Sequence, residues 1–369
     1  MADLPFKNAT IAIVGVGLIG GSLGLAFKRL GIGREIVGIS RQETLDEARR
    51  LGVIDSGYPY DVMADGVGRA DLVFLCAPIL RILEQLPQVM ASVPAGCVVS
   101  DVGSTKRALV DRAEALGREG VYFIGGHPMA GSEKNGVGAA DPFLFENALY
   151  VLTPAAGVPN ERVNTLIDLV HRLGARPMQM DAATHDRVAS AVSHLPQMMA
   201  TTLVGLVGRL HERDGLPLQM AAGGFRDMTR IASSSFAMWR DICQTNAEAI
   251  REMIDAYIEA FTAIRNRVGN EVLLDDFTYA NHIRATIPKD SKGFLNPLHE
   301  ILLVVADKPG VIADVASRLA QANINIEDIE VLKVREGEGG TIRMGFNRQR
   351  DAERAVAILL EANYQVRLR

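Results

Sequence analysis

The sequence lacks several features that mark secreted, membrane-spanning or metal-binding proteins. Its 369 residues include three cysteines, Cys76, Cys97 and Cys243, which are odd in number and far apart. A disulfide framework or a cysteine-rich zinc site is therefore not expected. No apolar run is long enough to cross a bilayer, and the first residues lack the basic and apolar segments of a signal peptide. We expect a cytoplasmic protein that does not bind membranes.

The sequence also has no strong excess of acidic or basic residues. The formal net charge is −5, and no run of lysine and arginine forms a basic stripe. Nucleic acids and anionic membrane surfaces are therefore not expected as partners. The apolar and charged fractions are ordinary for a globular protein, and the length suggests two or three domains.

The first half of the sequence alternates between strand-like and helical patterns. Short apolar runs rich in Val, Ile and Leu, as expected for strands buried on both faces, occur at residues 11–14, 36–39, 72–76, 98–101, 122–124, 149–152 and 176–180. Helical stretches lie between them. This alternation predicts an α/β fold with a Rossmann-type, doubly wound, mostly parallel sheet over residues 1–181.

Beyond this region the strand pattern stops and later returns. Long helical patterns predict an all-α domain over residues 182–287, which completes a substrate cleft and forms a dimer interface. Residues 288–297 are polar and rich in turn formers, which indicates a linker. Residues 298–369 then show a βαββαβ order, which predicts a ferredoxin-like domain.

A glycine-rich motif follows the first strand-like run and opens a helix. In Gly15-Val16-Gly17-Leu18-Ile19-Gly20, the first glycine permits a tight turn and the second lets backbone amides approach a pyrophosphate. The third allows the helix to pack closely on the strand. The helix start, which includes Leu18 and Ile19, offers free amides to phosphates. The alternative is an ordinary glycine-rich turn.

The second strand-like run bears on cofactor choice. Enzymes that bind NAD usually place an acidic residue about 20 residues after the glycine motif, where it holds the ribose hydroxyls. Here Ser40 and Arg41 occupy the end of that strand. They can instead receive the 2′-phosphate of NADP, or Arg41 can be a solvated residue at a helix start. The expected cofactor is NAD+, with NADP+ as the alternative.

Two loops at predicted strand ends, residues 101–106 and 125–133, carry polar residues suited to chemistry. Pro128 biases His127 toward an extended conformation, which presents its imidazole at the sheet edge. The alternative is a structural turn histidine. Ser104 is a candidate N-cap of the helix that follows it, and this role is compatible with contact to a ligand at the same loop.

In the helical region, Pro196 should kink a long helix beside His194. His185 lies nine residues before His194, on the opposite face of a regular helix, so the two are not expected to share a metal ion. No metal site is predicted.

Arg226 and Arg230 are four residues apart and share one face if that segment is helical. Guanidinium pairs suit carboxylates, although salt bridges with Asp227 or Asp241 are the alternative. Trp239 is the only tryptophan and belongs either to the core or to a pocket.

Taken together, five segments resemble prephenate dehydrogenases in their order and spacing. They are GVGLIGGSLGLA, DVGSTK, GGHPMAGSEKNGV, SHLP and GGFRDMTRIASSSFAMWRDI. The C-terminal part resembles an ACT domain in its segments DKPGVIADV and NINIEDIEV. The resemblance covers essentially the whole chain. It implies oxidative decarboxylation of prephenate to 4-hydroxyphenylpyruvate in tyrosine biosynthesis, with arogenate as the alternative substrate.

The resemblance also implies roles for individual residues. His127 matches the catalytic histidine that hydrogen-bonds the ring hydroxyl, Ser104 the serine that supports this contact, and His194 a second active-site histidine. Arg230 matches the arginine that binds a substrate carboxylate. Other pocket residues are matched by Glu133, Gly223 and Trp239. If His127 has an ordinary pKa, activity should fall on acidification near ~6.5.

The sequence departs from the family at Gln197, where relatives often have histidine, and at Phe236, where many have proline. The helical domain predicts a homodimer, and the ACT domain predicts inhibition by tyrosine, with a purely structural or dimerising domain as the alternative. A β-hydroxyacid dehydrogenase is disfavoured, because residues 181–212 lack the lysine that such enzymes use. A non-catalytic amino-acid sensor is disfavoured because every expected site position holds a competent residue.

Overall fold

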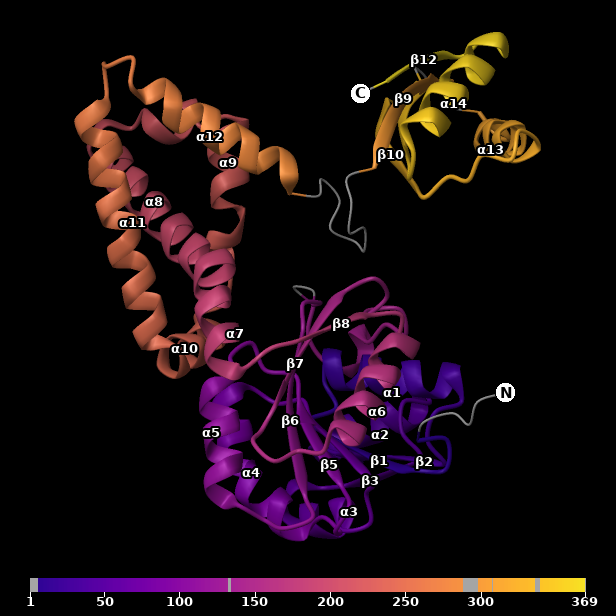
Figure 1. The fold of residues 1–369 in the computed structure, drawn as a ribbon, viewed down its shortest axis with the longest axis vertical. Helices are drawn as coiled ribbons and strands as arrows, with labels where there is room; N and C mark the ends of the chain where they lie inside the picture. The colour runs from indigo at the N-terminus through magenta and orange to yellow at the C-terminus, as the bar shows by residue number, and fades with distance from the viewer. Residues whose placement is uncertain (1–5, 132–133, 288–297, 307, 336–338, 369) are drawn as a thin grey trace. The chain divides into compact units, whose positions relative to one another are not determined.

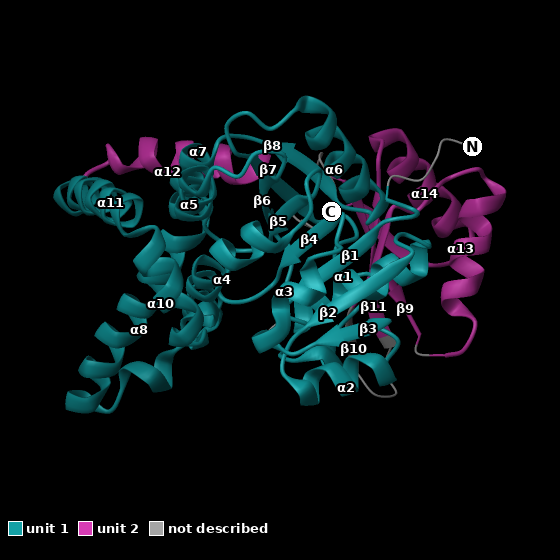
Figure 2. Ribbon diagram, turned by 90° about the horizontal axis from the view of Figure 1, so that it is seen from below, with its two compact units in different colours: residues 1–268 teal, residues 269–369 magenta. Residues whose placement is uncertain are grey.

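The structure is a computed structural model that describes residues 6–131, 134–287, 298–306, 308–335 and 339–368 (Figure 1). The chain divides into two compact units, residues 1–268 and 269–369 (Figure 2). The predicted linker, residues 288–297, lies outside the described residues. The division after Val268 falls inside the predicted helical domain, whose boundaries stay a prediction.

The first unit is built on an eight-stranded sheet with the order β3-β2-β1-β4-β5-β6-β7-β8. Its strands are β1 (Thr10–Val14), β2 (Glu35–Ile39), β3 (Ser56–Tyr58), β4 (Leu72–Leu75), β5 (Val98–Asp101), β6 (Tyr122–Pro128), β7 (Leu149–Pro154) and β8 (Arg176–Gln179). Neighbouring strands are parallel except β6 and β7. The predicted doubly wound, mostly parallel sheet is confirmed.

Helices cover both faces of this sheet. The helices of this region are α1 (Leu18–Leu30), α2 (Gln42–Arg50), α3 (Met63–Val67), α4 (Ile79–Ser92), α5 (Arg107–Leu116) and α6 (Asn160–Arg172). In β1, Ile11 and Ile13 pack into one apolar core with α1, α2 and α6, whereas Ala12 and Val14 pack into a second core with α3, α4 and α5. Burial on both faces explains why these strands read as continuous apolar runs.

The first unit ends in a helical region. It contains α7 (Ala182–Ala189), a π-helix (Ser190–His194), α8 (Leu195–Asp214), α9 (Gly223–Thr229), α10 (Phe236–Thr245) and α11 (Ala247–Arg267). Pro196 has no N–H group to continue the α-helical ladder, and the N–H of Leu195 donates to the Ser190 carbonyl five residues earlier. The predicted disturbance at Pro196 therefore takes the form of a π-helix.

The second unit begins with α12 (Leu273–Thr286) and continues into a separate α/β domain with its own core. The elements of that domain are β9 (His299–Val305), α13 (Val311–Gln321), β10 (Asp328–Arg335), β11 (Gly339–Phe346), α14 (Gln349–Glu361) and β12 (Gln365–Leu368). They form an antiparallel sheet with the order β10-β11-β9-β12. The predicted βαββαβ plan is confirmed.

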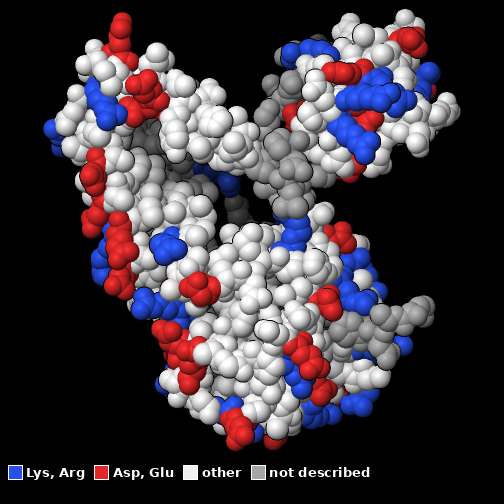
Figure 3. All heavy atoms as spheres, viewed as in Figure 1, with Lys and Arg blue, Asp and Glu red and all other residues white. Residues whose placement is uncertain are grey.

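Two surface properties bear on partners. Among the described helices, none is both long and apolar enough to traverse a bilayer. On the face drawn in Figure 3, acidic and basic side chains are interspersed over the nucleotide-binding region.

Candidate active site

The glycine motif forms the turn between β1 and α1. Gly15 has φ +98°, and a Cβ atom there would lie 2.7 Å from the Cys76 carbonyl oxygen. A Cβ atom on Gly20 would lie 2.2 Å from the carbonyl oxygen of Gly15, so neither position tolerates a side chain. A Cβ atom on Gly17 would instead meet nothing within 4 Å. The space beside Gly17 is open, as a bound pyrophosphate requires.

The first turn of α1 leaves its amides available to that space. Gly17 is the N-cap residue, no side chain caps the helix, and no acidic residue lies in its first turn. The N–H groups of Leu18, Ile19 and Gly20 have no partner within the helix. This arrangement fits the diphosphate of a dinucleotide.

The end of β2 matches the sequence analysis. Ser40 is buried, and its backbone N–H donates to the Tyr58 carbonyl over 3.2 Å. Arg41 follows at the exposed start of α2, and its guanidinium has no hydrogen bond or ion pair with any described residue. No carboxylate directly follows the strand.

His127 lies near the end of β6. Because β6 is parallel to β5, this end lies at the same sheet edge as the glycine motif. A buried ion pair holds the strand there. The Lys106 ammonium pairs with Asp101 and donates to the Gly126 carbonyl over 2.7 Å, and Asp101 accepts the Gly126 N–H over 3.1 Å.

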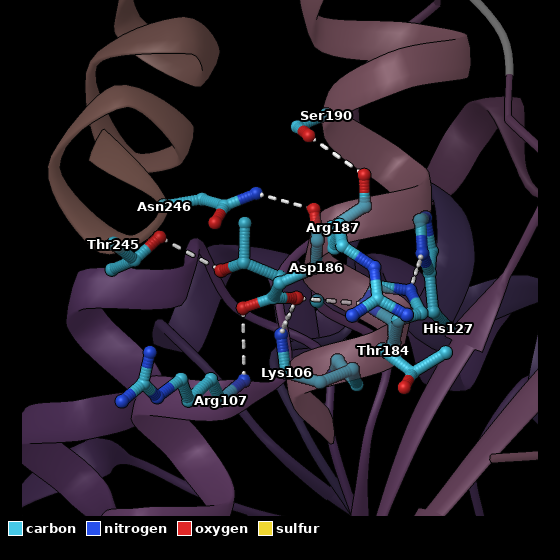
Figure 4. Close-up of polar contacts among 12 residues, drawn as sticks. Lys106, Arg107, His127, Thr184, Asp186, Arg187, Ser190, Thr245 and Asn246 are labelled. Atoms are coloured by element: carbon cyan, nitrogen blue, oxygen red, sulfur yellow. Dashed lines mark hydrogen bonds and ion pairs between the residues drawn. The ribbon is translucent and has the colours of Figure 1, made fainter. Parts of the chain in front are cut away.

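A chain of hydrogen bonds leads from His127 into the helical region (Figure 4). Its Nδ1 lies 2.8 Å from Nε2 of His185, and Nδ1 of His185 lies 2.7 Å from Oδ1 of Asp186. Asp186 also accepts the backbone N–H groups of Lys106 over 2.7 Å and Arg107 over 3.0 Å. Asp186 on α7 thus joins the imidazoles to the start of α5.

The surroundings of His127 favour its neutral form. Burial holds the pKa of His127 well below its usual range, and His185, Lys106 and His194 lower this pKa further. Burial also lowers the pKa of Lys106, although Asp101 opposes this effect. The expected loss of activity on acidification therefore moves below ~6.5, the value for an unperturbed imidazole.

Ser104 lies in the loop after β5 and is partly exposed. The interpretation of Ser104 as a helix cap is wrong, because α5 begins at Arg107 with Lys106 as its N-cap residue. The carboxylate of Asp186 binds the amides there instead. No described residue hydrogen-bonds the Ser104 hydroxyl, so it is available to a ligand.

His194 occupies the last position of the π-helix and is buried. Its Nδ1 lies 3.2 Å from the Asn246 amide nitrogen, and its ring meets Trp239 edge-on with centroids 5.8 Å apart. Burial is the main cause that lowers the pKa of His194 to about 4. The indole nitrogen of Trp239 is buried without a hydrogen-bond partner among the described residues.

The prediction that His185 and His194 lie on opposite faces assumed a regular α-helix. A π-helix turns through a smaller angle per residue, so with Ser190–His194 in this form the two side chains are not separated by the roughly 180° of a regular α-helix. Both histidines lie close enough to His127 to lower its pKa.

The structure does not join the remaining predicted residues to this cluster through any described contact. Gly223 opens α9, and Arg230 is exposed at the start of a short 3-10 helix, Arg230–Ser233. Asp241 does not pair with Arg230, because it binds Arg240 and the N–H of Leu80. Glu133 lies outside the described residues.

Both departures from the family pattern are accommodated. Gln197 is buried, and its amide donates to the Thr201 hydroxyl over 3.3 Å. Phe236 is the first residue of α10, a position that suits proline equally well, so the helix start is unchanged.

Sequence reasoning did not assign a role to His185, Asp186, Asn246 or Lys106. The adjacent His185 and Asp186 were a usable signal, because a carboxylate beside an imidazole commonly orients it. The contribution of Asn246 depends on packing between distant helices and has no local signal.

Comparison with known proteins agrees with this geometry. Family models match residues 23–179 as the prephenate dehydrogenase nucleotide-binding domain, residues 181–278 as the prephenate dehydrogenase dimerization domain and residues 299–358 as an ACT domain. The prephenate dehydrogenase of Bacillus subtilis is 38% identical over 351 residues, which cover 94% of each chain.

Two solved structures are also similar. The prephenate dehydrogenase from A. aeolicus in complex with hydroxyphenyl propionate and NAD+ has a TM-score of 0.68 and 30% identity, over 75% of this chain and 96% of that chain. The arogenate dehydrogenase of Synechocystis has a TM-score of 0.68 and 29% identity, over 75% of this chain and 99% of that chain. The chain belongs to the prephenate dehydrogenase family of oxidoreductases and carries a C-terminal ACT domain.

Proposed function

We propose that this protein oxidises and decarboxylates prephenate to 4-hydroxyphenylpyruvate and CO2 in tyrosine biosynthesis. The observation that carries the proposal is the partly buried imidazole of His127, with a lowered pKa that favours its neutral form, at the sheet edge that holds the dinucleotide motif. A neutral imidazole can accept a hydroxyl proton near pH 7. The relatives named above support prephenate as the substrate.

In this proposal each site residue has one task. His127 accepts the proton of the ring hydroxyl as the O–H bond breaks, and Ser104 supports that contact. Arg230 pairs with a substrate carboxylate and fixes the ring's orientation. His194, neutral and packed against Trp239, presents its remaining N–H to the pocket, which Gly223 helps to line. Loss of the ring carboxylate as CO2 then yields an aromatic ring.

The proposed cofactor is NAD+, which accepts the hydride. Support comes from the open space at Gly17 and the free amides at the start of α1. Binding of NADP+ is the second candidate, because Ser40 and Arg41 stand where an acidic residue would reject a 2′-phosphate.

The test is a two-by-two steady-state assay of prephenate or arogenate with NAD+ or NADP+. The proposal predicts the highest kcat/KM with prephenate and NAD+. A preference for arogenate would replace the substrate, and activity with neither substrate would refute the function.

We further propose a homodimer formed by the helical region. Large apolar side chains are exposed on α8 at Val204, Leu206 and Leu210, and on α11 at Ile258 and Phe261. Few charged side chains lie over α8 in Figure 3. A second copy would cover such surfaces. Sedimentation that shows a monomer at micromolar concentration would contradict this.

We place the protein in the cytoplasm. All three cysteines, Cys76, Cys97 and Cys243, are free, as a reducing compartment requires.

We also propose that tyrosine binds the ACT domain and inhibits the enzyme. The domain has its own apolar core, which includes Leu303, Val315 and Leu359, so it can act as a separate ligand-binding module. Activity should be titrated with tyrosine in the full chain and in a variant that lacks residues 296–369. Inhibition should be lost in the shortened chain, and equal insensitivity of both would exclude regulation.

A further inference from the structure

The hydrogen-bond chain from His127 to the start of α5 determines which nitrogen carries each proton. A carboxylate only accepts hydrogen bonds, and Asp186 accepts two backbone N–H groups besides facing His185. Nδ1 of His185 must therefore be the donor to Asp186. In a neutral His185, Nε2 is then an acceptor.

The donor in the hydrogen bond between His127 and His185 can be assigned in the same way. Because Nε2 of His185 is an acceptor, Nδ1 of His127 must carry the proton of their 2.8 Å hydrogen bond. The neutral His127 ring then has its lone pair on Nε2, which no described residue hydrogen-bonds. A proton acceptor needs this tautomer, whereas the other tautomer would present an N–H group to the substrate.

We propose that His185, itself oriented by Asp186, is a positioning residue that holds His127 in the Nδ1–H tautomer. This inference rests on the proposed role of His127 as the base. When Nε2 takes the hydroxyl proton, the Nδ1–H group keeps its bond to His185. The carboxylate of Asp186 strengthens that bond by accepting from the far side of the His185 ring.

The rings themselves support a fixed geometry. The centroids of His127 and His185 are 5.1 Å apart, with the planes inclined at 67°. His185 is 3% exposed and Asp186 is 2% exposed, so water competes little for either hydrogen bond. Asn246 donates to the Asp186 carbonyl over 2.9 Å, which fixes the backbone of the carboxylate-bearing residue.

The hydrogen bonds that link His127, His185 and Asp186 join elements that are far apart in the sequence, so the site is complete only when these elements pack together. Asp186 comes from α7 and binds the amides at the start of α5, whereas His127 comes from β6. Packing of the helical region against the sheet thus determines which ring nitrogen of His127 carries the proton.

Two substitutions separate the positioning role from simple packing. His185→Ala removes the acceptor of the His127 Nδ1–H group, and we expect kcat to fall on the order of tenfold or more with little change in KM. His185→Gln offers an amide oxygen near the position of Nε2 and should restore most of kcat. His171→Asn, on the exposed face of α6, is the matched control and should change nothing.

The pH profile gives a further readout. His185 lowers the pKa of His127 together with burial, Lys106 and His194. In His185→Ala the last two remain, so the acid limb of kcat should move to higher pH. Unchanged kcat in His185→Ala, or equal losses in the alanine and glutamine variants, would overturn the proposal.

Nitrogen-15 NMR of the histidine rings in the full chain tests the tautomer without any assay. His127, assigned from the spectrum of His127→Asn, should show the Nδ1–H tautomer at pH 7. The Nε2–H tautomer would overturn the inference even in an active enzyme. If the wild type oxidises neither substrate, the proposed function fails. The NMR result still shows whether His127 has the tautomer that the hydrogen bonds predict.

Discussion

At the scale of the residue, one imidazole combines burial with a fixed tautomer. Burial and the neighbouring Lys106, His185 and His194 keep His127 neutral, and His185 leaves Nε2 free to accept a proton. A low pKa weakens the base, but it keeps the imidazole in its accepting form over a wide pH range.

The pH dependence of turnover follows from the lowered pKa of His127. The neutral form is the active form, and its pKa lies well below the usual 6.5. We expect kcat to stay flat as the pH falls through 6.5 and to decline only at more acidic values. A steady-state rate profile checks this, and a decline centred near ~6.5 would show that burial does not control the group.

A second single-residue prediction concerns Arg230. Arg230→Gln removes the positive charge that we propose pairs with a substrate carboxylate, so KM for prephenate should rise by about tenfold or more while kcat changes less. Arg226→Gln removes an equally exposed charge one helical turn earlier and is the matched control. Equal effects of the two variants would reduce the role of Arg230 to general electrostatics.

At the scale of the element, the sequence predicts strands whose two faces are both buried. Ile11–Val14 is apolar at every position because two cores meet there. The edge strand Ser56–Tyr58 escaped prediction because it is short and only partly buried. The π-helix also escaped, since the phase change before Pro196 has no counterpart in apolar periodicity.

The candidate site was predicted only in part for the same reason. His127 and the glycine motif lie at strand ends, where local pattern predicts position. His185, the hydrogen-bond partner of His127, lies 58 residues away in the chain, and Asp186 and Asn246 are 60 residues apart. Their contacts depend on how α7 and α11 pack on the sheet. Local spacing contains no information about that packing.

The start of α5 is held by the carboxylate of Asp186. Both carboxylate oxygens of Asp186 face N–H donors, so in Asp186→Asn the amide group must oppose at least one of them. We expect a loss of about 1–3 kcal/mol in the free energy of unfolding, measured with urea. Asp181→Asn, at the cap of α7, retains the oxygen that accepts the Thr184 N–H and is the control. Equal stability of the two variants would exclude a structural role for the Asp186 carboxylate.

At the scale of the whole molecule, the buried neutral histidines link stability to pH. The pKa of His194 is lowered from 6.5 to about 4, so the unfolded chain binds more protons in that interval. The stabilisation is complete above the unfolded pKa and is lost as the pH falls toward 4. The thermal midpoint should therefore decline below pH 6.5 and decline less in His194→Gln. Parallel declines would assign acid sensitivity to other groups.

The molecule also separates chemistry from regulation along the chain. The sheet and helices α7 to α11 contain the histidine cluster, whereas the ACT domain folds around its own core in the second unit. An effector that binds the ACT domain would have to act through the domain linkage or through a second copy of the chain.

The most direct test of whether His127 is the base is the turnover of His127→Asn with prephenate and NAD+. The asparagine amide can still donate to His185, so folding and cofactor affinity should persist while the proton acceptor is lost. We predict a fall in kcat on the order of 10² or more. A variant that keeps near-wild-type kcat would contradict the assignment of His127 as the base.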